Sequence, residues 1–477
     1  MRPLTGFGRQ IEEFNNSRLS LGLLRNNGDF FNGASTIAFD SRRPSPGTSG
    51  EADPRNAITG GAFAAARRFW RALGPGIITG AADDDPSGIA TYSIAGAQFG
   101  TGLLWMALLS WPFMAAVQTM CARIGMVTGR GLMSALRKKF PRPLLLAACG
   151  ALFIANTINI GSDLAGMADA AELLTHVSSH IWVVLFGVLI AFATVRLRYI
   201  MIANVLKWLA LVLFAYVITA FIVGPHWSLV ARDTFVPRMP PEPGAWAMVV
   251  AILGTTISPY LFFWQASQEV EEEKAMGRHS ILARRGATPE EIKTRKWDVG
   301  LGTLFSNVAM FFIILTTALT LHKAGITNPQ TSHEVASALR PLAGNLATLL
   351  YTVGLLGVGA LAIPTLSGSA AYAFAETFGW NQGIDERFGR ARAFYIVVII
   401  AMLLGVTLDF ANVNPVKALY WTAILNGLLA PFLLLGILVT ASDRRLMQGQ
   451  PSSSLGRFVV GLTTLVMFGA AFAMFVF

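Results

Sequence analysis

The sequence predicts an all-α membrane protein with eleven transmembrane helices, and three observations support this fold class. Of the 477 residues, 53% are hydrophobic and only 13% are charged. Apolar stretches of about 20 residues follow one another along the chain, and each is long enough to cross a bilayer as a helix. Lys and Arg gather in alternate loops between these stretches, as expected when those loops face the cytoplasm.

The polar N-terminal region is predicted to be a disordered cytoplasmic tail spanning residues 1–65. Its segment Ser41–Gly50 has too few apolar residues to fold on its own. The tail has no apolar core followed by a cleavage site, so no secretory signal peptide is expected. Residues 63–73 combine arginines with Phe69 and Trp70, which is typical of a segment lying on the membrane surface.

The positions of the apolar stretches define the expected spans. They are residues 75–98, 103–123, 145–173, 180–195, 200–223, 246–271, 298–321, 346–376, 393–408, 416–440 and 458–477. The loop from Glu269 to Asp298 is the most charged, and we interpret it as a solvated cytoplasmic connector with two short helices, a gating role being the alternative. The basic loops predict a multi-pass protein of the plasma (inner) membrane with its N-terminus in the cytoplasm and Phe477 outside.

The net charge of +10 comes largely from these loops. The bilayer is therefore the expected macromolecular partner, nucleic acid is not expected as a partner, and a monomer is the default expectation.

Two of the spans are interrupted by polar and helix-breaking residues. The first contains Asp83-Asp84-Asp85-Pro86-Ser87-Gly88, and the sixth contains Gly254-Thr255-Thr256-Ile257-Ser258-Pro259-Tyr260. Carboxylates inside a membrane are costly and are kept where they have a function. An unwound backbone at membrane depth must be buried in protein or line a cavity. Two interrupted spans at corresponding places predict a transporter's substrate site.

The spacing of the two interruptions predicts the chain's internal organisation. They lie five spans apart, so a second five-span repeat would enter the membrane from the opposite side. We expect a LeuT-type inverted repeat, with residues 66–223 as the first repeat and 246–440 as the second. The eleventh span, within residues 457–477, is an addition to the two repeats.

The residue types at the two breaks favour a hard divalent ion as the substrate. Asp85 supplies a carboxylate, Ser87, Thr255, Thr256 and Ser258 supply neutral oxygens, and broken helix ends expose carbonyls. An oxygen-only set suits Mg²⁺ or Mn²⁺. Neither break contains Cys, Met or His, and the six histidines fall in loops or at span ends. This pattern disfavours a zinc-type site and a histidine proton relay.

Several segments resemble the Nramp family of divalent-metal transporters over about residues 70–440. The matching segments are 74–76 with 85–88, Gly96–Gly100, Ala122–Gly129, Ser162–Ala165 and the stretch from Gly354 to Gly368. The resemblance implies a LeuT-type fold, transport of a divalent metal ion and a metal ligand at Asp85. It implies no enzyme activity and no cofactor besides the transported ion.

The departures from the family pattern concern the ligands. The family's D-P-G-N motif ends here in Gly88, and its M-P-H motif reads Ser258-Pro259-Tyr260. The backbone carbonyl that ligates the metal in the family corresponds to Thr255. Gly166 stands where the family carries an acid used in proton movement. The chain is therefore most similar to the Nramp-related magnesium transporter branch. This likeness implies Mg²⁺ import, with Mn²⁺ also carried and weak or absent proton coupling.

The predicted site has metal ligands and surrounding pathway residues. The predicted ligands are Asp85, Gly88, Thr255 and Ser258. The predicted pathway or supporting residues are Asp83, Asp84, Ser87, Asp163, Tyr260 and Gln265. For Asp163 a structural acid is the alternative, with Asn159 and Asn156 as its partners. For Gln265 and Ser258, hydrogen bonding to a neighbouring helix or to the backbone is the alternative.

Other functions compete with this interpretation. A proton-coupled Mn²⁺/Fe²⁺ importer of the main Nramp branch keeps the fold and changes the substrate. A non-transporting metal sensor would use the loop from Glu269 to Asp298 as its output. A membrane-embedded aspartic protease needs two carboxylates that converge on one water, and only Asp85 and Asp163 are formally suited to this.

Overall fold

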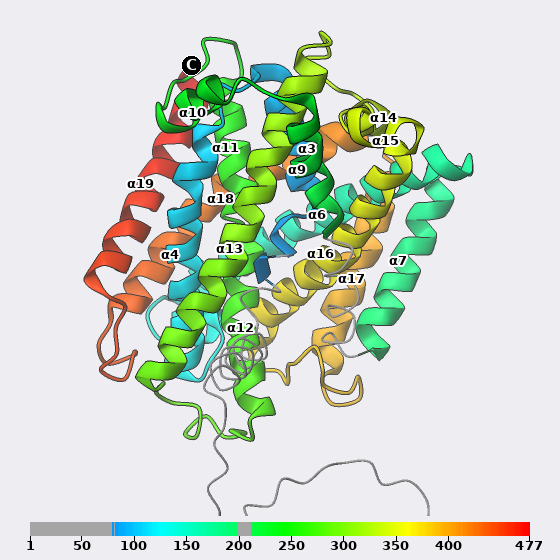
Figure 1. The fold of residues 1–477 in the computed structure, drawn as a ribbon. Coiled ribbons are helices and arrows are strands. Elements are labelled where there is room, and N and C mark those ends of the chain that lie inside the picture. Colours follow the sequence, from blue (N-terminus) through cyan, green and yellow to red (C-terminus); the bar gives the residue numbers. More distant parts are fainter. Residues whose placement is uncertain (1–78, 81, 198–210, 412) are drawn as a thin grey trace, which may run out of the picture. The chain divides into compact units, whose positions relative to one another are not determined.

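A computed structural model describes residues 79–80, 82–197, 211–411 and 413–477, and every regular element in them is a helix (Figure 1). The predicted tail, the surface segment 63–73, the start of the first span and residues 198–210 of the fifth lie outside the described residues. Contacts separate Met1–Ala62 from Phe63–Phe477, and all described residues belong to the second unit.

Nine helical stretches in the described residues are long and apolar enough to cross a membrane. They contain α4 (Trp105–Thr128), α6 (Arg142–Thr175), α7 (Ser179–Arg196), α11 with α12 (Ala245–Thr256 and Pro259–Ala275), α13 (Pro289–Thr317) with η2 (Ala318–His322), α16 (Ala347–Phe378), α17 (Arg392–Asp409), α18 (Pro415–Ser442) and α19 (Ser454–Val476). Each corresponds to an expected span, so the helical membrane fold class is confirmed.

The first and fifth expected spans are described only in part. They contain α3 (Pro86–Phe99) and, after the turn η1 (Leu211–Leu213), α9 (Phe214–Val223). The count of eleven and the five-plus-five repeat therefore stay predictions. The sequence analysis did not predict the short loop helices, which are α5 (Leu132–Leu136), α10 (Trp227–Phe235), α14 (Ser332–Ser337), α15 (Arg340–Ala343) and η3 (Gly344–Leu346).

The interpretation of residues 269–298 as a solvated connector with two short helices was wrong at its ends, where the helices are continuations of α12 and α13 and several charged residues are buried. Helix α12 continues to Ala275, and α13 begins at Pro289 behind a capping box formed by Thr288 and Glu291. The connector is only residues 276–288. Arg295 is buried and pairs with Glu269, 2.8 Å away, and also with Glu272 and Asp298. These charges can be buried because they pair across α12 and α13.

Glycine contacts hold the broken helix α11 tightly against α18. A Cβ added at Gly254 would lie 2.0 Å from the Ala423 carbonyl oxygen, and one at Gly427 would lie 2.3 Å from that of Val250. A Cβ added at Gly80 would likewise lie 2.3 Å from the Gly302 carbonyl oxygen of α13. Helices pack this closely only where side chains are absent at the crossing. The backbone around both breaks is therefore fixed by α13 and α18.

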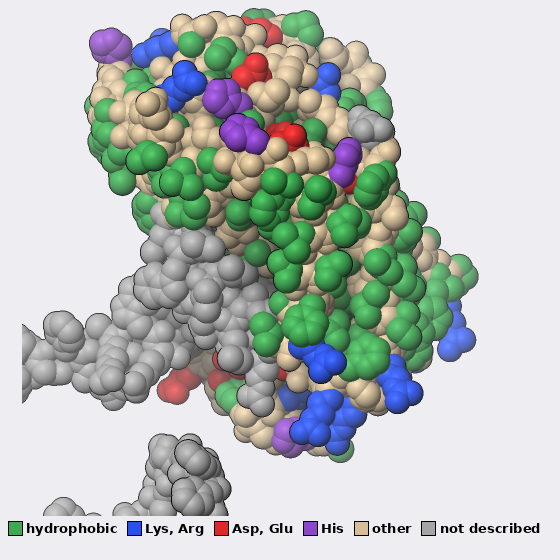
Figure 2. Space-filling model, turned by 90° about the vertical axis from the view of Figure 1, so that its right-hand side faces the viewer, with side chains coloured by type: hydrophobic (Ala, Val, Ile, Leu, Met, Phe, Trp, Pro, Cys, Tyr) green, Lys and Arg blue, Asp and Glu red, His purple; other side chains and the backbone are tan. Residues whose placement is uncertain are grey.

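Hydrophobic side chains cover the middle of the surface in Figure 2, and Lys and Arg cluster at its lower end. Large apolar residues such as Phe192, Phe221 and Phe432 are exposed on the described part of the protein, which suits contact with lipid rather than water. The loops of residues 129–141, 276–288, 379–391 and 443–453 gather at the lower end in Figure 1, and we call it the basic end. Phe477 lies at the opposite end.

A candidate metal site between two broken helices

The first break lies at Asp84 and Asp85, where the helical turn before them stops and α3 begins. Asp85 is the N-cap of α3, and its Oδ1 accepts hydrogen bonds from the Gly88 amide (2.8 Å) and the Ser87 hydroxyl (2.6 Å). Pro86 starts the helix because its missing N–H would be unpaired there in any case. The predicted interruption of this span is confirmed, and Asp85 is buried within it.

The second break separates α11, which ends at Thr256, from α12, which begins at Pro259. Ser258 occupies the N-cap position of α12, but its hydroxyl turns back and donates to the carbonyls of Gly254 (2.9 Å) and Thr255. These bonds match the alternative considered for Ser258, in which its hydroxyl hydrogen-bonds to the backbone. The hydroxyl proton is directed to the backbone, so its oxygen lone pairs are the part that could face a cation.

Hydrogen bonds join the two breaks directly. The Tyr92 hydroxyl of α3 accepts from Thr255 Oγ1 at 3.0 Å and lies 3.3 Å from Thr256 Oγ1. The Tyr260 hydroxyl of α12 donates to the Ala82 carbonyl, 2.9 Å away, just before the first break. These side chains are buried. The two interruptions, more than 160 residues apart in the sequence, therefore meet in space.

Helix α6 adds an amide and a second carboxylate to this junction. Asn159 Nδ2 donates to Asp85 Oδ2 at 3.0 Å and to Asp163 Oδ2 at 3.1 Å. The amide nitrogen must point this way, because both partners are acceptors when ionised. The backbone N–H of Ser87, in the first turn of α3, also faces Asp163. Asn159 Oδ1 is buried and has no hydrogen-bond partner among the described residues.

Asp83 and Asp84 face a different helix from Asp85. Both accept from the Ser306 hydroxyl of α13, at 2.6 Å for Asp83 Oδ2 and 3.0 Å for Asp84 Oδ1. A hydroxyl has one proton, so it serves the two carboxylates alternately. Both side chains are buried. The three consecutive acids therefore split between an α6 side and an α13 side.

The predicted residue Gln265 lies apart from the junction. Its Nε2 donates to Glu269 Oε1 at 2.7 Å, and Glu269 belongs to the ion-pair cluster around Arg295. Gln265 thus extends that cluster along α12. The structure brings together a larger group around the breaks: Asp85, Ser87, Gly88, Asp163, Thr255, Thr256, Ser258 and Tyr260.

Two side chains of the junction, Tyr92 and Ser306, were not predicted from the sequence. Tyr92 and Ser306 carry no signal in a single sequence, because a tyrosine or serine in an apolar helix is usually a packing residue. Asn159 was considered only as a partner of Asp163, since it lies one turn earlier on the same face. Its second bond, to Asp85, required the α3–α6 contact. Asn156, the other expected partner, instead donates to Leu366 O and Ser369 Oγ of α16, both at 2.9 Å.

No group of three or more His, Cys, Asp or Glu side chains in the described residues is arranged to hold a metal ion. A cation at the junction would therefore depend on few carboxylates together with carbonyl, amide and hydroxyl oxygens. Such ligands suit a hard ion that keeps some of its water. The fold and the junction define a helical membrane protein with a buried, oxygen-lined site between two interrupted helices.

The chain belongs to the Nramp family. The family profile described as natural resistance-associated macrophage protein-like matches residues 76–477. A curated relative, the divalent metal cation transporter MntH of Yersinia pestis (strain Pestoides F), is 26% identical over 413 residues. That match covers 81% of this chain and 91% of the relative.

Solved structures of other transporters share the fold. The manganese transporter of Eremococcus coleocola superposes with a TM-score of 0.67 at 18% identity, covering 85% of this chain and 88% of the other. Mhp1, a nucleobase-cation-symport-1 family transporter in a closed conformation, gives a TM-score of 0.52 at 15% identity, covering 84% and 91%. These matches place the chain in the LeuT-type fold that the two breaks predicted.

Proposed function

We propose that this protein carries divalent metal ions across the membrane and binds them where the two broken helices meet. The observation that carries the proposal is the buried Asp85 carboxylate at the first break. Among the described residues its Oδ2 accepts one hydrogen bond, from Asn159, so a lone pair remains for a cation. The relatives named as a divalent metal cation transporter and a manganese transporter support the same substrate class.

The ligand chemistry favours Mg²⁺, with Mn²⁺ also carried. We propose that Asp85, the carbonyl of Thr255 and Ser258 bind the metal ion, with Asn159 Oδ1 as a further oxygen. Gly88 has no side chain and so leaves space for the ion. A thioether favours transition metals, and Ser258 stands where the family pattern has Met. Mg²⁺ sheds water reluctantly and is usually bound by one or two carboxylates with waters retained. A site without soft ligands and without a side chain at residue 88 suits that ion.

Proton coupling is proposed to be weak or absent. Tyr260 occupies the position of the family's His, and its hydroxyl donates to a backbone carbonyl. At Gly166, where the family has an acid, an added Cβ would lie 3.0 Å from Leu419 Cδ1 of α18. A carboxylate side chain there would need the Leu419 side chain to move. The inside-negative potential would drive import instead, with roughly 2.3 kcal/mol per charge per 100 mV and twice that for a divalent ion.

The proposal also covers the membrane location, the orientation and the oligomeric state of the protein. We infer a plasma (inner) membrane location with the basic end in the cytoplasm, because Lys and Arg concentrate in the loops of that end. A monomer is sufficient for the mechanism, because both breaks and the α6 side chains belong to one chain.

The test is metal flux into proteoliposomes that contain a Mg²⁺ indicator, a Mn²⁺ indicator or a pH dye, with Asp85→Ala as the control. Mg²⁺ uptake without a pH change, lost in the variant, is the expected result. Mn²⁺ or Fe²⁺ uptake with protons and without Mg²⁺ would contradict the ion assignment and favour the main-branch importer. No flux of any metal would contradict transport and favour the sensor.

A further inference from the structure

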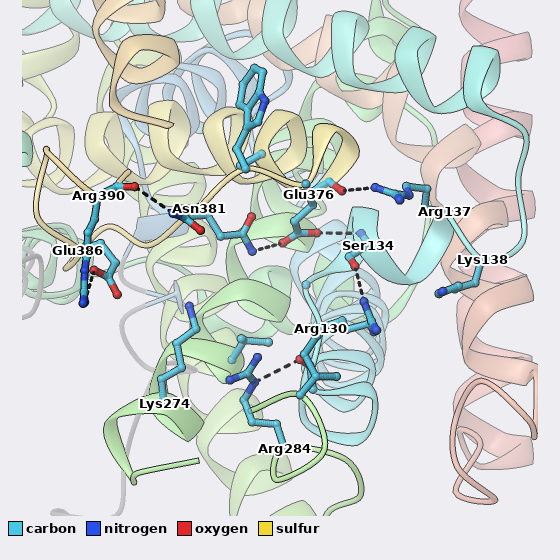
Figure 3. Close-up of a pocket in the computed structure, with 18 residues that line it drawn as sticks. Arg130, Ser134, Arg137, Lys138, Lys274, Arg284, Glu376, Asn381, Glu386 and Arg390 are labelled. Carbon is cyan, nitrogen blue, oxygen red and sulfur yellow. Dashed lines mark hydrogen bonds and ion pairs between the residues drawn. The ribbon is translucent and has the colours of Figure 1, made fainter. Parts of the chain in front are cut away.

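A cavity of about 670 Å³ opens at the basic end, away from the two breaks. Its walls come from the loop after α4, from α5 and the residues after it, from the ends of α12 and α16, and from the loops that follow α12 and α16. Figure 3 shows Arg130, Lys274 and Arg284 on one side and Glu376, Asn381 and Arg390 on the other. Six basic side chains line the cavity: Arg130, Arg137, Lys138, Lys274, Arg284 and Arg390.

The two acidic residues of the lining do not neutralise this charge. Glu376 is buried, and its carboxylate accepts from the Ser134 amide (2.9 Å), from Ser267 Oγ (3.2 Å) and from Gln382 Nε2 (3.2 Å). All three donors are neutral. Glu386 lies 3.8 Å from Arg390 at the exposed rim, where an ion pair contributes little.

Arg284 is a buried cation held by backbone carbonyls rather than by a carboxylate. It is 6% exposed and donates to the carbonyls of Gly129, Arg278 and His279. Among the described residues no acid lies within ion-pair distance of it. Glu273, the acid that attracts it from α12, lies 3.8 Å from Arg278. A buried cation that shares one carboxylate with a second cation and forms no direct ion pair is only partly compensated.

Lys274 forms an ion pair with Glu271 at 2.9 Å, whereas Arg130, Arg137 and Lys138 form no ion pair among the described residues. Arg130 has Ser134 Oγ at 3.4 Å, and Arg137 donates to the Thr377 carbonyl at 3.0 Å. Lys138 has no side-chain partner in the part of the chain that the structure describes. Burial and the like charges of Arg285, Arg137 and Arg284 lower the pKa of Arg130. Cations that repel one another across a shared cavity form a site for an anion.

A metal ion leaving the protein would be repelled by this lining, so the cavity is a poor continuation of a cation pathway. Arg and Lys are the side chains that recognise phosphate, through forked guanidinium bonds and through point charge. The cavity volume falls within the roughly 300–1,000 Å³ of small-molecule sites. We propose that this cavity binds an anion carrying two or more phosphate groups, either a soluble polyphosphate compound or a phosphorylated lipid headgroup at the membrane surface. The proposal does not depend on the ion that the protein transports.

The experiment is calorimetric titration of the detergent-purified full chain with ATP and with inorganic tripolyphosphate, both without divalent metal. A second arm titrates the chain in nanodiscs against short-chain phosphatidylinositol phosphate. The test variants are Lys138→Gln and Arg130→Gln. The matched control is Lys296→Gln, an exposed lysine of α13 that does not line the cavity. A thermal melt of each variant checks that the fold is unchanged.

We expect each test variant to weaken binding about tenfold, as for a lost charge-assisted hydrogen bond, and the control to bind like the wild type. Binding of ATP or tripolyphosphate with this pattern would identify a soluble ligand. Binding of the lipid with this pattern, and of neither soluble anion, would identify the headgroup as the source. Absence of binding for all three ligands, or equal affinities in Lys138→Gln, Arg130→Gln and wild type, would overturn the proposal.

Discussion

The amide of Asn159 holds the Asp85 carboxylate at 3.0 Å, so that an α6 side chain fixes the acid of the first break. The same amide donates to Asp163 at 3.1 Å. One neutral side chain therefore keeps two carboxylates in place without cancelling their charge, and its own Oδ1 remains without a partner among the described residues. This arrangement makes α6 part of the candidate site rather than only its support.

Replacing Asn159 tests this role. Asn159→Ala removes one donor from each of two buried carboxylates, so we expect a stability loss of about 1–3 kcal/mol and a fall in metal flux of at least about tenfold. Flux into proteoliposomes and thermal melts measure the two effects. The matched control is Asn156→Ala, which loses bonds to α16 one turn away and should reduce stability with little loss of flux per folded protein. Equal flux losses in both variants would contradict a specific role for Asn159.

Substitutions of Ser258 test whether this side chain sets the ion selectivity. Ser258→Met introduces a thioether at the second break and should raise the preference for Mn²⁺ or Cd²⁺ over Mg²⁺ by about tenfold or more, because sulfur ligands favour softer ions. Competition between these ions in a flux assay measures the ratio. Ser258→Ala is the control, because it removes the hydroxyl without adding sulfur and should leave the ratio near that of wild type. An unchanged ratio in Ser258→Met would mean that this side chain does not set selectivity.

The close approach of α11 and α18 makes a prediction about stability. Gly254→Ala would place a methyl group 2.0 Å from the Ala423 carbonyl oxygen, so the helices must separate. We expect a loss of about 3 kcal/mol or more, together with reduced flux because the second break moves. Gly300→Ala in α13 is the control, since a Cβ there meets nothing within 4 Å. It should be neutral or slightly stabilising, because Ala favours helix. Similar melting temperatures for the two variants would contradict the packing argument.

The ion-pair cluster between α12 and α13 makes another prediction. Arg295→Met leaves Glu269, Glu272 and Asp298 without their shared cation, and removal of one partner from a buried pair costs about 3–5 kcal/mol. A melting curve in detergent measures the loss. The exposed neighbour Lys296→Met should have little effect. Adding Glu269→Gln to Arg295→Met should restore part of the stability. If the double variant were less stable than Arg295→Met, the charge explanation would fail.

Some features of the structure can be predicted from a short stretch of sequence, and others depend on contacts between distant residues. Asp85-Pro86 and Ser258-Pro259 favour helix starts, because each proline suits the first helical position and follows a residue type that caps helices. The ends of the charged segment 269–298 were wrongly assigned to a connector, because composition does not show that α12 and α13 extend into it. Composition cannot show that Arg295 faces Glu269 across two helices. The partners of Asp83 and Asp84 were missed for the same reason, since Ser306 lies more than 220 residues away.

The sequence by itself determined the fold class, most of the spans, the positions of the two breaks and the presence of Asp85 at the first of them. These follow from hydropathy over about 20 residues and from the backbone chemistry of proline, which act within a few helical turns. The tertiary structure alone decided that Asn159 bridges Asp85 and Asp163 and that Tyr92 joins α3 to α11. It also decided that cations from separate segments of the chain share one cavity. Those contacts depend on which helices pack together, and packing joins residues that no local pattern in one sequence connects.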